Sequence, residues 1–388
     1  MLVVVLIAAL VVSLDSLINN EEAPSFYVGV TYCGNSPAEA KLLIDRVKNY
    51  TNLFVLQSGP MSNNETAINE ICDYAAATGL NIMCYFGCLD SLWQVNWLDS
   101  AKQRWGGQFL GVYYYDEPGG TQLDYNWSRC FHNLKLENSP MYQAHVEAME
   151  AFLNGSLAKD YELAAKIYVD IIKNDSGIQE LRKRSITSFT SDYALYWFDY
   201  LGGYDVLLAQ LGWNDTLTRS IGLIRGAAYL QNKSWGTIIT WKYTEPPYID
   251  TAENIYQQMV ASYEAGAKYV VIFNYPQYPA NNDYGILDDD HFEALERFWN
   301  DVVISPNTIQ GSLEAEAVLV LPEGYGWGMR RPDDRIWYWQ AGVRAQSIWE
   351  LSLSILSEYD MRLDIVCDSS DFPTAGKYAE IYHWSNST

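Results

Sequence analysis

The stretch Phe109–Gly120, FLGVYYYDEPGG, decides the fold of this chain. Its first seven residues, Phe109–Tyr115, are mostly aromatic or β-branched, which favours a buried β-strand. Asp116 and Glu117 follow this strand, and Pro118 ends it because proline has no backbone N–H. In α/β sheets and barrels, ligands bind at the carboxyl ends of the parallel strands. We interpret Glu117 as half of a catalytic carboxylate pair, although acids before a proline are equally typical of a helix N-cap or a surface turn.

Strand-like and helix-like segments alternate along the chain. The predicted strands are 26–32, 53–57, 81–86, 109–115, 185–189, 206–211, 236–241 and 269–274. The predicted helices are 37–48, 65–77, 97–105, 157–184, 196–200, 216–231, 252–265 and 291–303. Eight strand–helix units in succession predict a (β/α)8 TIM barrel over 23–304, since a doubly wound open sheet rarely carries eight such units. The segment 119–156 is expected to be a long functional loop such as a lid.

A second, smaller unit is predicted after the barrel. Residues 305–312 indicate a linker, and 313–388 contain predicted strands at 315–321, 363–367 and 379–384 with a helix at 337–359. This order predicts a Rossmann-like or flavodoxin-like α/β domain. The unit is short for such a sheet, so we expect a partial, truncated domain.

Composition excludes several classes of function. The chain has 25 basic and 48 acidic residues and a formal charge of -23, which argues against a nucleic-acid partner. The four histidines show no ligand spacing, so no metal is predicted, and no glycine-rich phosphate loop precedes a helix, so no cofactor is predicted. A Gly-x-Ser-x-Gly elbow is also missing, which disfavours a serine hydrolase. The six cysteines form no disulfide framework, and Cys88–Cys130 is the pairing that we expect if both lie at one end of the barrel.

The N-terminus and the sequons indicate export. Residues 1–12, MLVVVLIAALVV, resemble the apolar region of a signal peptide and are short for a membrane span, which needs about 20 residues. No basic residue precedes them, so 1–22 is expected to be either a signal peptide or a membrane anchor. Eight asparagines stand in Asn-x-Ser/Thr, namely Asn49, Asn64, Asn126, Asn154, Asn174, Asn214, Asn232 and Asn386. We therefore expect an extracellular or cell-surface glycoprotein.

Two glutamates are expected at the mouth of the predicted barrel. Glu117 follows strand four, and Glu245 follows strand seven in the sequence Tyr243-Thr244-Glu245-Pro246. A carboxylate pair suits glycoside hydrolysis, with retention of configuration at a separation of about 5–5.5 Å and inversion at about 6.5–9.5 Å. The proton donor needs a raised pKa, which an apolar wall or a negative neighbour supplies.

This arrangement resembles the large clan of glycoside hydrolases whose two catalytic glutamates end barrel strands four and seven. The resemblance implies that Glu117 is the acid/base, that Glu245 is the nucleophile, and that the mechanism is retaining. The clan usually has asparagine before its acid/base glutamate, whereas Asp116 stands here and adds a negative charge. The tail LVLPEGYGWGMRRPDD is similar to the amidotransferase-like domain that follows the barrel in some β-galactosidase-related families.

Polar and aromatic side chains at the other strand ends are expected to bind the sugar. Aromatic faces stack on sugar rings, and amides and carboxylates bind hydroxyls. The predicted substrate-binding residues are Asp116, Gln57, Tyr85, Asp192, Gln210, Trp213, Trp241, Lys242, Asn274 and Tyr275. Most aromatic residues of a chain with 14 Trp and 30 Tyr belong to the core, and Lys242 equally suits a structural ion pair with Asp116 or Glu117.

The prediction is thus a glycoside hydrolase whose partner is an oligo- or polysaccharide substrate. Two alternatives remain at this point: a carbohydrate-binding barrel without catalysis, and a structural cell-surface glycoprotein. Membrane anchoring through residues 1–12 and assembly into a homo-oligomer are left open.

Overall fold

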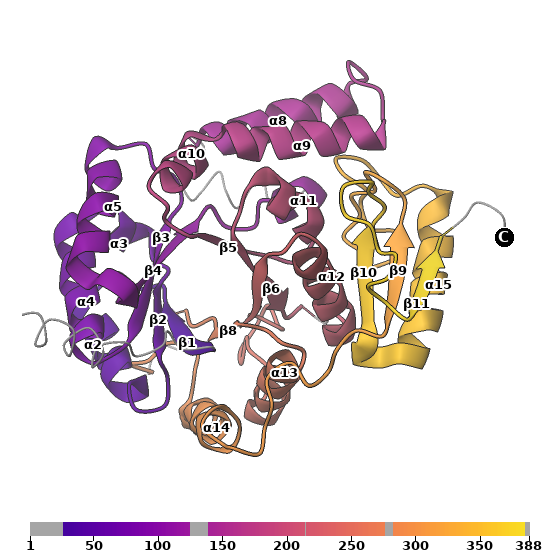
Figure 1. The fold of residues 1–388 in the computed structure, drawn as a ribbon. Helices are drawn as coiled ribbons and strands as arrows, with labels where there is room; N and C mark the ends of the chain where they lie inside the picture. Colours follow the sequence, from indigo (N-terminus) through magenta and orange to yellow (C-terminus); the bar gives the residue numbers. More distant parts are fainter. Residues whose placement is uncertain (1–25, 125–138, 214, 276–281, 385–388) are drawn as a thin grey trace, which may run out of the picture.

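The computed structural model describes residues 26–124, 139–213, 215–275 and 282–384. Eight parallel strands form a closed barrel in sequence order, and β1 pairs with β8 to close it (Figure 1). The strands are β1 Tyr27–Tyr32, β2 Leu53–Leu56, β3 Asn81–Phe86, β4 Phe109–Tyr114, β5 Ser188–Asp192, β6 Val206–Leu211, β7 Ser234–Ile239 and β8 Tyr269–Ile272. The predicted (β/α)8 barrel is confirmed.

Two apolar layers stabilise the barrel. Alternate residues of a strand point to opposite faces, so each strand contributes to the interior and to the layer beneath the helices. The interior is filled by large side chains, including the stacked rings of Tyr27 and Tyr269, whose centroids lie 5.1 Å apart. Its other buried members include Leu53, Val55, Met83, Tyr113, Phe189, Val206, Leu208, Ile238 and Val271. The barrel is therefore a packed core, and ligands have access only at its ends.

The helices surround the barrel in the predicted order, although α5 begins five residues before its predicted start at residue 97, α14 ends at Phe298, and the short helix α3 was not predicted. They are α2 Pro37–Val47, α3 Gly59–Ser62, α4 Glu65–Ala77, α5 Leu92–Trp105, α9 Tyr161–Asn174, α10 Ser176–Lys183, α11 Tyr196–Gly202, α12 Leu217–Leu230, α13 Ala252–Glu264 and α14 Asp289–Phe298. Short 3-10 and π turns follow α5 at Gly106–Gln108 and α14 at Trp299–Val303. Side chains of Ser36, Asn64 and Thr251 accept hydrogen bonds from the first turns of α2, α4 and α13, which accounts for where these helices begin.

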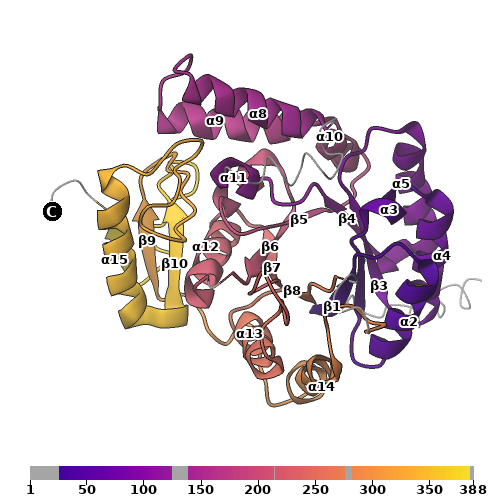
Figure 2. The same cartoon turned by 180° about the vertical axis from the view of Figure 1, so that it is seen from behind.

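The segment between β4 and β5 differs from its prediction. Instead of one long loop over 119–156, it contains α6 Gly120–Leu123 and α8 Pro140–Leu153, and α8 lies side by side with α9 in both views (Figures 1 and 2). The predicted helix 157–184 is two helices. Asp175 leaves helical geometry at φ -62° and ψ 131°, and its carboxylate accepts the N–H groups of Gly177 and Ile178 at the start of α10.

The last residues form a three-stranded parallel sheet in the order β10-β9-β11. Its strands are β9 Ala317–Leu321, β10 Leu363–Cys367 and β11 Glu380–His383, with helix α15 Val343–Tyr359 on one side and a 3-10 turn at Asp360–Arg362. β10 packs on α12 of the barrel (Figure 1). The helix was predicted from Trp337, but it begins six residues later because the buried side chain of Trp337 donates to the carbonyl of Gly324, 2.7 Å away, within the preceding loop.

Glycines allow α12 and β10 to come into direct contact. A Cβ atom at Gly222 would lie 2.5 Å from the carbonyl oxygen of Leu363, and one at Gly226 would lie 2.8 Å from Val366. Between these glycines on the helix, Arg225 forms an ion pair with Asp364 at 2.8 Å. This contact between barrel and sheet is called the seam below.

Several predictions fall on residues outside the described ranges: the leader 1–22, the sequons at Asn126, Asn214 and Asn386, and Cys130 of the predicted disulfide. The five cysteines that the structure describes do not pair with one another, although the sulfurs of Cys72 and Cys84 lie 3.4 Å apart. Within the described ranges, the helices are too short or too polar to span a bilayer.

Candidate active site

The backbone after β4 leaves the strand through two residues in left-handed geometry. Tyr115 has φ 51° and Glu117 has φ 54°, values that are uncommon for residues other than glycine and that concentrate at functional sites. The N–H of Glu117 donates to the carbonyl of Ser191 on β5 at 3.1 Å. The turn places Asp116 and Glu117 at the carboxyl end of the barrel, and Glu117 is only 7% exposed.

A hydrogen-bonded cluster connects both acids to neighbouring strands. The amide of Gln210, on β6, donates to Glu117 Oε1 at 2.5 Å and to Ser191 Oγ at 3.0 Å. Asp116 Oδ1 accepts from the hydroxyls of Tyr113 and Ser191. Three of the predicted site residues, Asp116, Glu117 and Gln210, are thereby brought together.

Burial changes the protonation of this cluster. It raises the pKa of Glu117 well above its usual range, and the neighbouring Asp116 raises it further, against a smaller opposite effect of the Gln210 hydrogen bond. Burial also raises the pKa of Asp116 to about 6, against the hydrogen bonds from Tyr113 and Ser191 that lower it. Burial and the neighbouring carboxylate therefore both favour the protonated form of Glu117.

Asp192, the last residue of β5, shapes the loop that follows Pro118. Its carboxylate accepts four backbone N–H groups, from Gly119 at 2.5 Å, Gly120 at 3.1 Å, Tyr193 at 2.8 Å and Ala194 at 3.2 Å. Burial raises its pKa to about 7 in spite of these bonds. The structure thus assigns both oxygens of Asp192 to the protein backbone beside Glu117.

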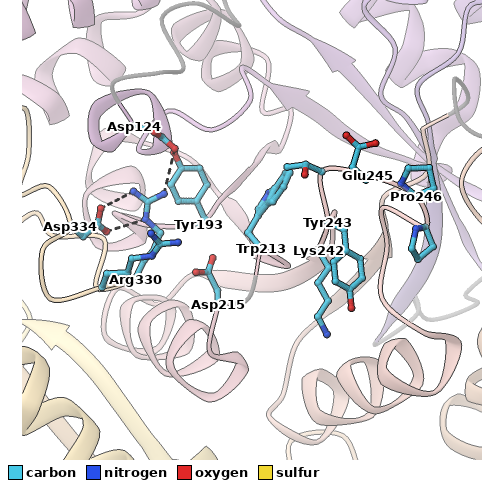
Figure 3. Close-up of a pocket in the computed structure, with 13 residues that line it drawn as sticks. Asp124, Tyr193, Trp213, Asp215, Lys242, Tyr243, Glu245, Pro246, Arg330 and Asp334 are labelled. Atoms are coloured by element: carbon cyan, nitrogen blue, oxygen red, sulfur yellow. Dashed lines mark hydrogen bonds and ion pairs between the residues drawn. The ribbon is translucent and has the colours of Figure 1, made fainter.

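A cavity of about 1160 Å³ opens at this end of the barrel (Figure 3). Its walls come from the loops after β4, β5, β6 and β7 and from the loop after β9. The lining residues are Asp124, Tyr193, Trp213, Asp215, Lys242, Tyr243, Thr244, Glu245, Pro246, Pro247, Arg330, Arg331 and Asp334. Glu117 itself does not line this cavity; Asp192 connects the two regions, because it accepts the N–H of the lining Tyr193 and that of Gly119, two residues after Glu117.

Glu245 lies on the cavity wall, away from the strand end at which it was predicted. β7 ends at Ile239 rather than at Trp241, and Glu245 is an exposed residue of the following loop. In Figure 3 the side chain of Trp213 lies between this loop and the group formed by Asp124 and Arg330.

Trp213 presents the most accessible aromatic face of the predicted set. Its side chain is 41% exposed, its φ is 49°, and its N–H donates to the carbonyl of Trp241 at 2.8 Å. The ring of Trp241 lies 6.3 Å from that of Trp213 and packs on Tyr248 and Tyr275 at 5.2 and 5.9 Å. Trp241 therefore connects Trp213 to the aromatic residues packed behind the cavity wall.

Two predicted residues make structural contacts. Lys242 lines the cavity, but its ammonium binds Asp250 at 2.7 Å, so the predicted pairing with Asp116 or Glu117 is wrong. Asn274 is 2% exposed and uses its amide on the next loop, donating to the carbonyl of Tyr284 at 2.5 Å and accepting the N–H of Ile286 at 3.1 Å.

Gln57 and Tyr85 lie at the other side of the mouth, after β2 and within β3. The ring of Tyr85 lies 5.8 Å from that of Tyr113, and the buried Oε1 of Gln57 has no hydrogen-bond partner among the described residues. Of the two, Tyr85 is placed next to the cluster around Asp116.

Sequence reasoning missed most of the charged residues of the cavity and the aromatic residue Tyr193; the charged residues that it missed are Asp124, Asp215, Arg330, Arg331 and Asp334. A local signal existed only for the last three, in the charged run MRRPDD of the loop after β9. Across the ranges that the structure describes, no three His, Cys, Asp or Glu side chains are grouped in a way that would hold a metal ion.

Fold and site together define a (β/α)8-barrel protein with a cavity at the carboxyl ends of its strands that is lined by charged and aromatic residues. The structure is similar to that of α-L-fucosidase isoenzyme 2 from Paenibacillus thiaminolyticus, with a TM-score of 0.51 and 12% sequence identity. The match covers 89% of this chain and 59% of the fucosidase chain, so this chain spans about three fifths of that protein. At this identity the likeness concerns the fold.

Other barrel enzymes match more weakly. A 3-keto-L-gulonate-6-phosphate decarboxylase from Vibrio cholerae matches at a TM-score of 0.36 and 9% identity, over 71% of this chain and 99% of its own. Orotidine 5'-monophosphate decarboxylase from Methanocaldococcus jannaschii matches at 0.36 and 7%, over 72% of this chain and 98% of its own. No protein-family model and no curated protein matches the sequence.

Proposed function

We propose that this protein is a glycoside hydrolase of oligo- or polysaccharides in which Glu117 donates the proton to the leaving oxygen. The observation that carries this proposal is the state of Glu117: a buried carboxyl group at the end of a barrel strand, with a pKa raised well above its usual range. A general acid must be protonated at the working pH and must release its proton in the transition state. The fold likeness to a fucosidase is consistent with this class but does not test it.

The neighbours of Glu117 support the role of acid. Gln210 donates an N–H to Oε1, and this bond favours an unprotonated oxygen at that atom. The proton is therefore expected on Oε2. Asp116 is held beside Glu117 by the hydroxyls of Tyr113 and Ser191. Its negative charge disfavours loss of the proton from Glu117.

The second carboxylate of the mechanism has two candidates. Glu245 is assigned by the resemblance to the clan, and it lies on the wall of the cavity. Asp116 adjoins Glu117 within the buried cluster. We propose Glu245 as nucleophile and retain Asp116 as the alternative, because Glu245 lines the space in which a sugar would bind.

Substitution of Glu117 by Gln tests the acid. The amide keeps the shape of the side chain and can still accept from Gln210, so the fold is expected to remain. Hydrolysis of glycosides with poor leaving groups should fall by about 10²- to 10⁴-fold, whereas an aryl glycoside with an acidic phenol, which needs no protonation, should be much less affected. Glu293→Gln, on the exposed side of α14, is the matched control. Equal rates of the Glu117 variant and the parent on the poor leaving groups would disprove the assignment.

The nucleophile is tested with alanine variants and an added small anion. If Glu245 attacks the sugar, azide should restore turnover to Glu245→Ala and yield a glycosyl azide, and Asp116→Ala should show no such rescue. The reverse pattern would transfer the role to Asp116. Sugar binding by the parent without turnover on any substrate would instead favour a carbohydrate-binding protein.

We also propose that the protein acts outside the cell. Five of its sequon asparagines lie in the described ranges, and all five are exposed: Asn49, Asn64, Asn154, Asn174 and Asn232. Exposure is required for attachment of a bulky glycan. A loss of mass on treatment of the secreted protein with an N-glycanase would support export with glycosylation, and an unmodified protein retained inside its native host would contradict it.

A further inference from the structure

The loop between β9 and α15 belongs to the C-terminal unit but lies against the barrel mouth. Arg219 of α12 donates to the carbonyl of Met329 at 3.2 Å and stacks its guanidinium on the ring of Trp349 at 4.0 Å. Trp337, near the end of the loop, packs its ring 4.6 Å from that of Phe198 on α11. These contacts fix the loop on the barrel at several points.

The fixed loop places Arg330 on the cavity wall. Its Nε and Nη2 donate to the two oxygens of Asp334 at 3.0 and 2.8 Å, a bidentate pairing that holds the guanidinium plane. The guanidinium also lies 4.7 Å from the centre of the ring of Tyr193, and Nη1 lies 3.6 Å from Asp124 Oδ2. Figure 3 shows Arg330 between Asp334 and Asp124.

This geometry leaves a donor beside an acceptor. Nη1 is the guanidinium nitrogen that Asp334 does not bind, and Asp124, with a side chain 37% exposed, is a carboxylate that only accepts. Two adjacent hydroxyls on a sugar ring match such a pair, because one accepts from Nη1 while the other donates to Asp124. Since Asp334 and Tyr193 already hold the guanidinium, little side-chain entropy remains to be lost on binding.

The carboxylates beside Arg330 disfavour acidic sugars at this point of the cavity. Arg330 already has two carboxylate neighbours, and Lys242 is paired with Asp250. The other charged side chains on the cavity wall are those of Asp215, Glu245 and Arg331, so the wall carries four carboxylates and three cations. A uronic acid, sulfate or phosphate at the pair of Arg330 and Asp124 would meet the carboxylates of Asp124 and Asp334 in a chain of formal charge -23, and like-charge contacts disfavour binding.

We propose that the loop of the C-terminal unit completes a sugar subsite in which Arg330 and Asp124 bind adjacent hydroxyls of a neutral sugar residue, with the exposed face of Trp213 as the stacking surface. This inference rests on the proposed function, since it assigns the recognition part of the same cavity. The cavity of about 1160 Å³ is larger than one ring requires, which fits an oligosaccharide that continues toward Glu245.

The test is a binding measurement in the full-length Glu117→Gln protein, so that turnover does not consume the ligand. An array of neutral oligosaccharides and their uronic-acid counterparts is the probe, followed by calorimetry on the neutral glycans that bind. Arg330→Met and Asp124→Asn should each weaken neutral-glycan binding by about tenfold or more, the loss expected for a charge-assisted hydrogen bond of about 1.5–3 kcal/mol. Arg330→Lys should not restore binding, because lysine lacks the planar fork. Arg362→Met, on the exposed surface of the same unit, is the control.

The ratio of neutral-glycan to uronic-acid-glycan binding shows whether Asp124 contacts the sugar or only supports Arg330. Asp124→Asn removes one negative charge, so it should reduce the discrimination against uronic-acid glycans while it weakens neutral ones; a purely structural role would weaken both alike. Parental affinity in a folded Arg330→Met variant, tighter binding of acidic than of neutral glycans by the parent, or no glycan binding at all would overturn the proposal. Glycan binding that depends on Arg330 in a protein without hydrolytic activity would uphold this inference and reject the proposed hydrolase.

Discussion

The ion pair at the seam is expected to contribute strongly to stability, and replacing Arg225 by Met tests this. The two side chains are 8% and 1% exposed, and Arg225 Nε lies 2.8 Å from Asp364 Oδ1. Arg225 also donates to the carbonyl groups of Leu313 at 3.1 Å and of Met361 at 2.7 Å. The variant leaves a buried carboxyl that still accepts a hydrogen bond from the hydroxyl of Tyr378 at 2.9 Å.

The expected loss is about 3–5 kcal/mol of unfolding free energy, the usual cost of removing one partner from a buried ion pair. Replacing both partners, Arg225→Met with Asp364→Leu, removes the isolated charge as well and should recover most of that loss. The double-mutant cycle should therefore be strongly non-additive. Arg362→Met, which breaks an exposed ion pair with Glu316 in the same unit, should cost no more than about 1 kcal/mol.

The assay is urea unfolding followed by circular dichroism and by tryptophan fluorescence, because agreement of the two probes tests for a single transition in a protein of two units. An early separate transition in the Arg225 variant would mean that the C-terminal sheet detaches from the barrel first. That result would also show that the substitution weakens the seam. A cost below about 1 kcal/mol for Arg225→Met, or additive effects in the cycle, would refute the reasoning.

Two further predictions concern backbone packing and pH. Gly222→Ala should destabilise the protein because the added Cβ would lie 2.5 Å from the carbonyl oxygen of Leu363, and this clash outweighs the gain of about 1 kcal/mol in helix propensity. Gly59→Ala, with open space around it, is the control. A rise in the urea midpoint of unfolding of the Gly222 variant would contradict the packing argument. Burial raises the pKa of Asp192 to about 7 and that of Asp215 to about 6, so the folded protein binds more protons than the unfolded chain between their ordinary and their raised values. The free energy of unfolding should consequently fall as the pH rises from about 4 to about 7. Urea titrations that show a rising free energy of unfolding across this range would contradict a dominant role of these two buried carboxyls.

The eight-fold alternation of strands and helices was predictable because it is written in local patterns. The strand Val206–Leu211 is apolar except for Gln210, as expected of a strand buried on both faces, and its bounds agree with the structure. The bounds of β5 were three residues too early, because its ends depend on the pairing of Ser188 with Val112 of β4. Pairing between strands distant in the sequence leaves no trace in the local composition.

Asp116 and Glu117 were recognisable from the sequence alone, since they directly follow an aromatic strand and precede a proline. Their surroundings were not: the amide of Gln210 and the hydroxyl of Ser191 reach them from other strands, and the burial that raises the pKa of Glu117 exists only in the closed barrel. Glu245 followed its predicted strand in sequence, yet β7 ends two residues earlier than predicted and leaves Glu245 on an exposed loop.

By itself, the sequence determined the order of the elements and the acids that end β4, because both depend on residues that are neighbours in the chain. Only the tertiary structure decided which side chains share the cavity. Arg330 belongs to the C-terminal unit and faces Asp124 of the barrel because Gly222 and Gly226 allow the sheet to pack directly on α12. A contact between two units is set by the shape and packing of both surfaces, and these exist only after each unit has folded.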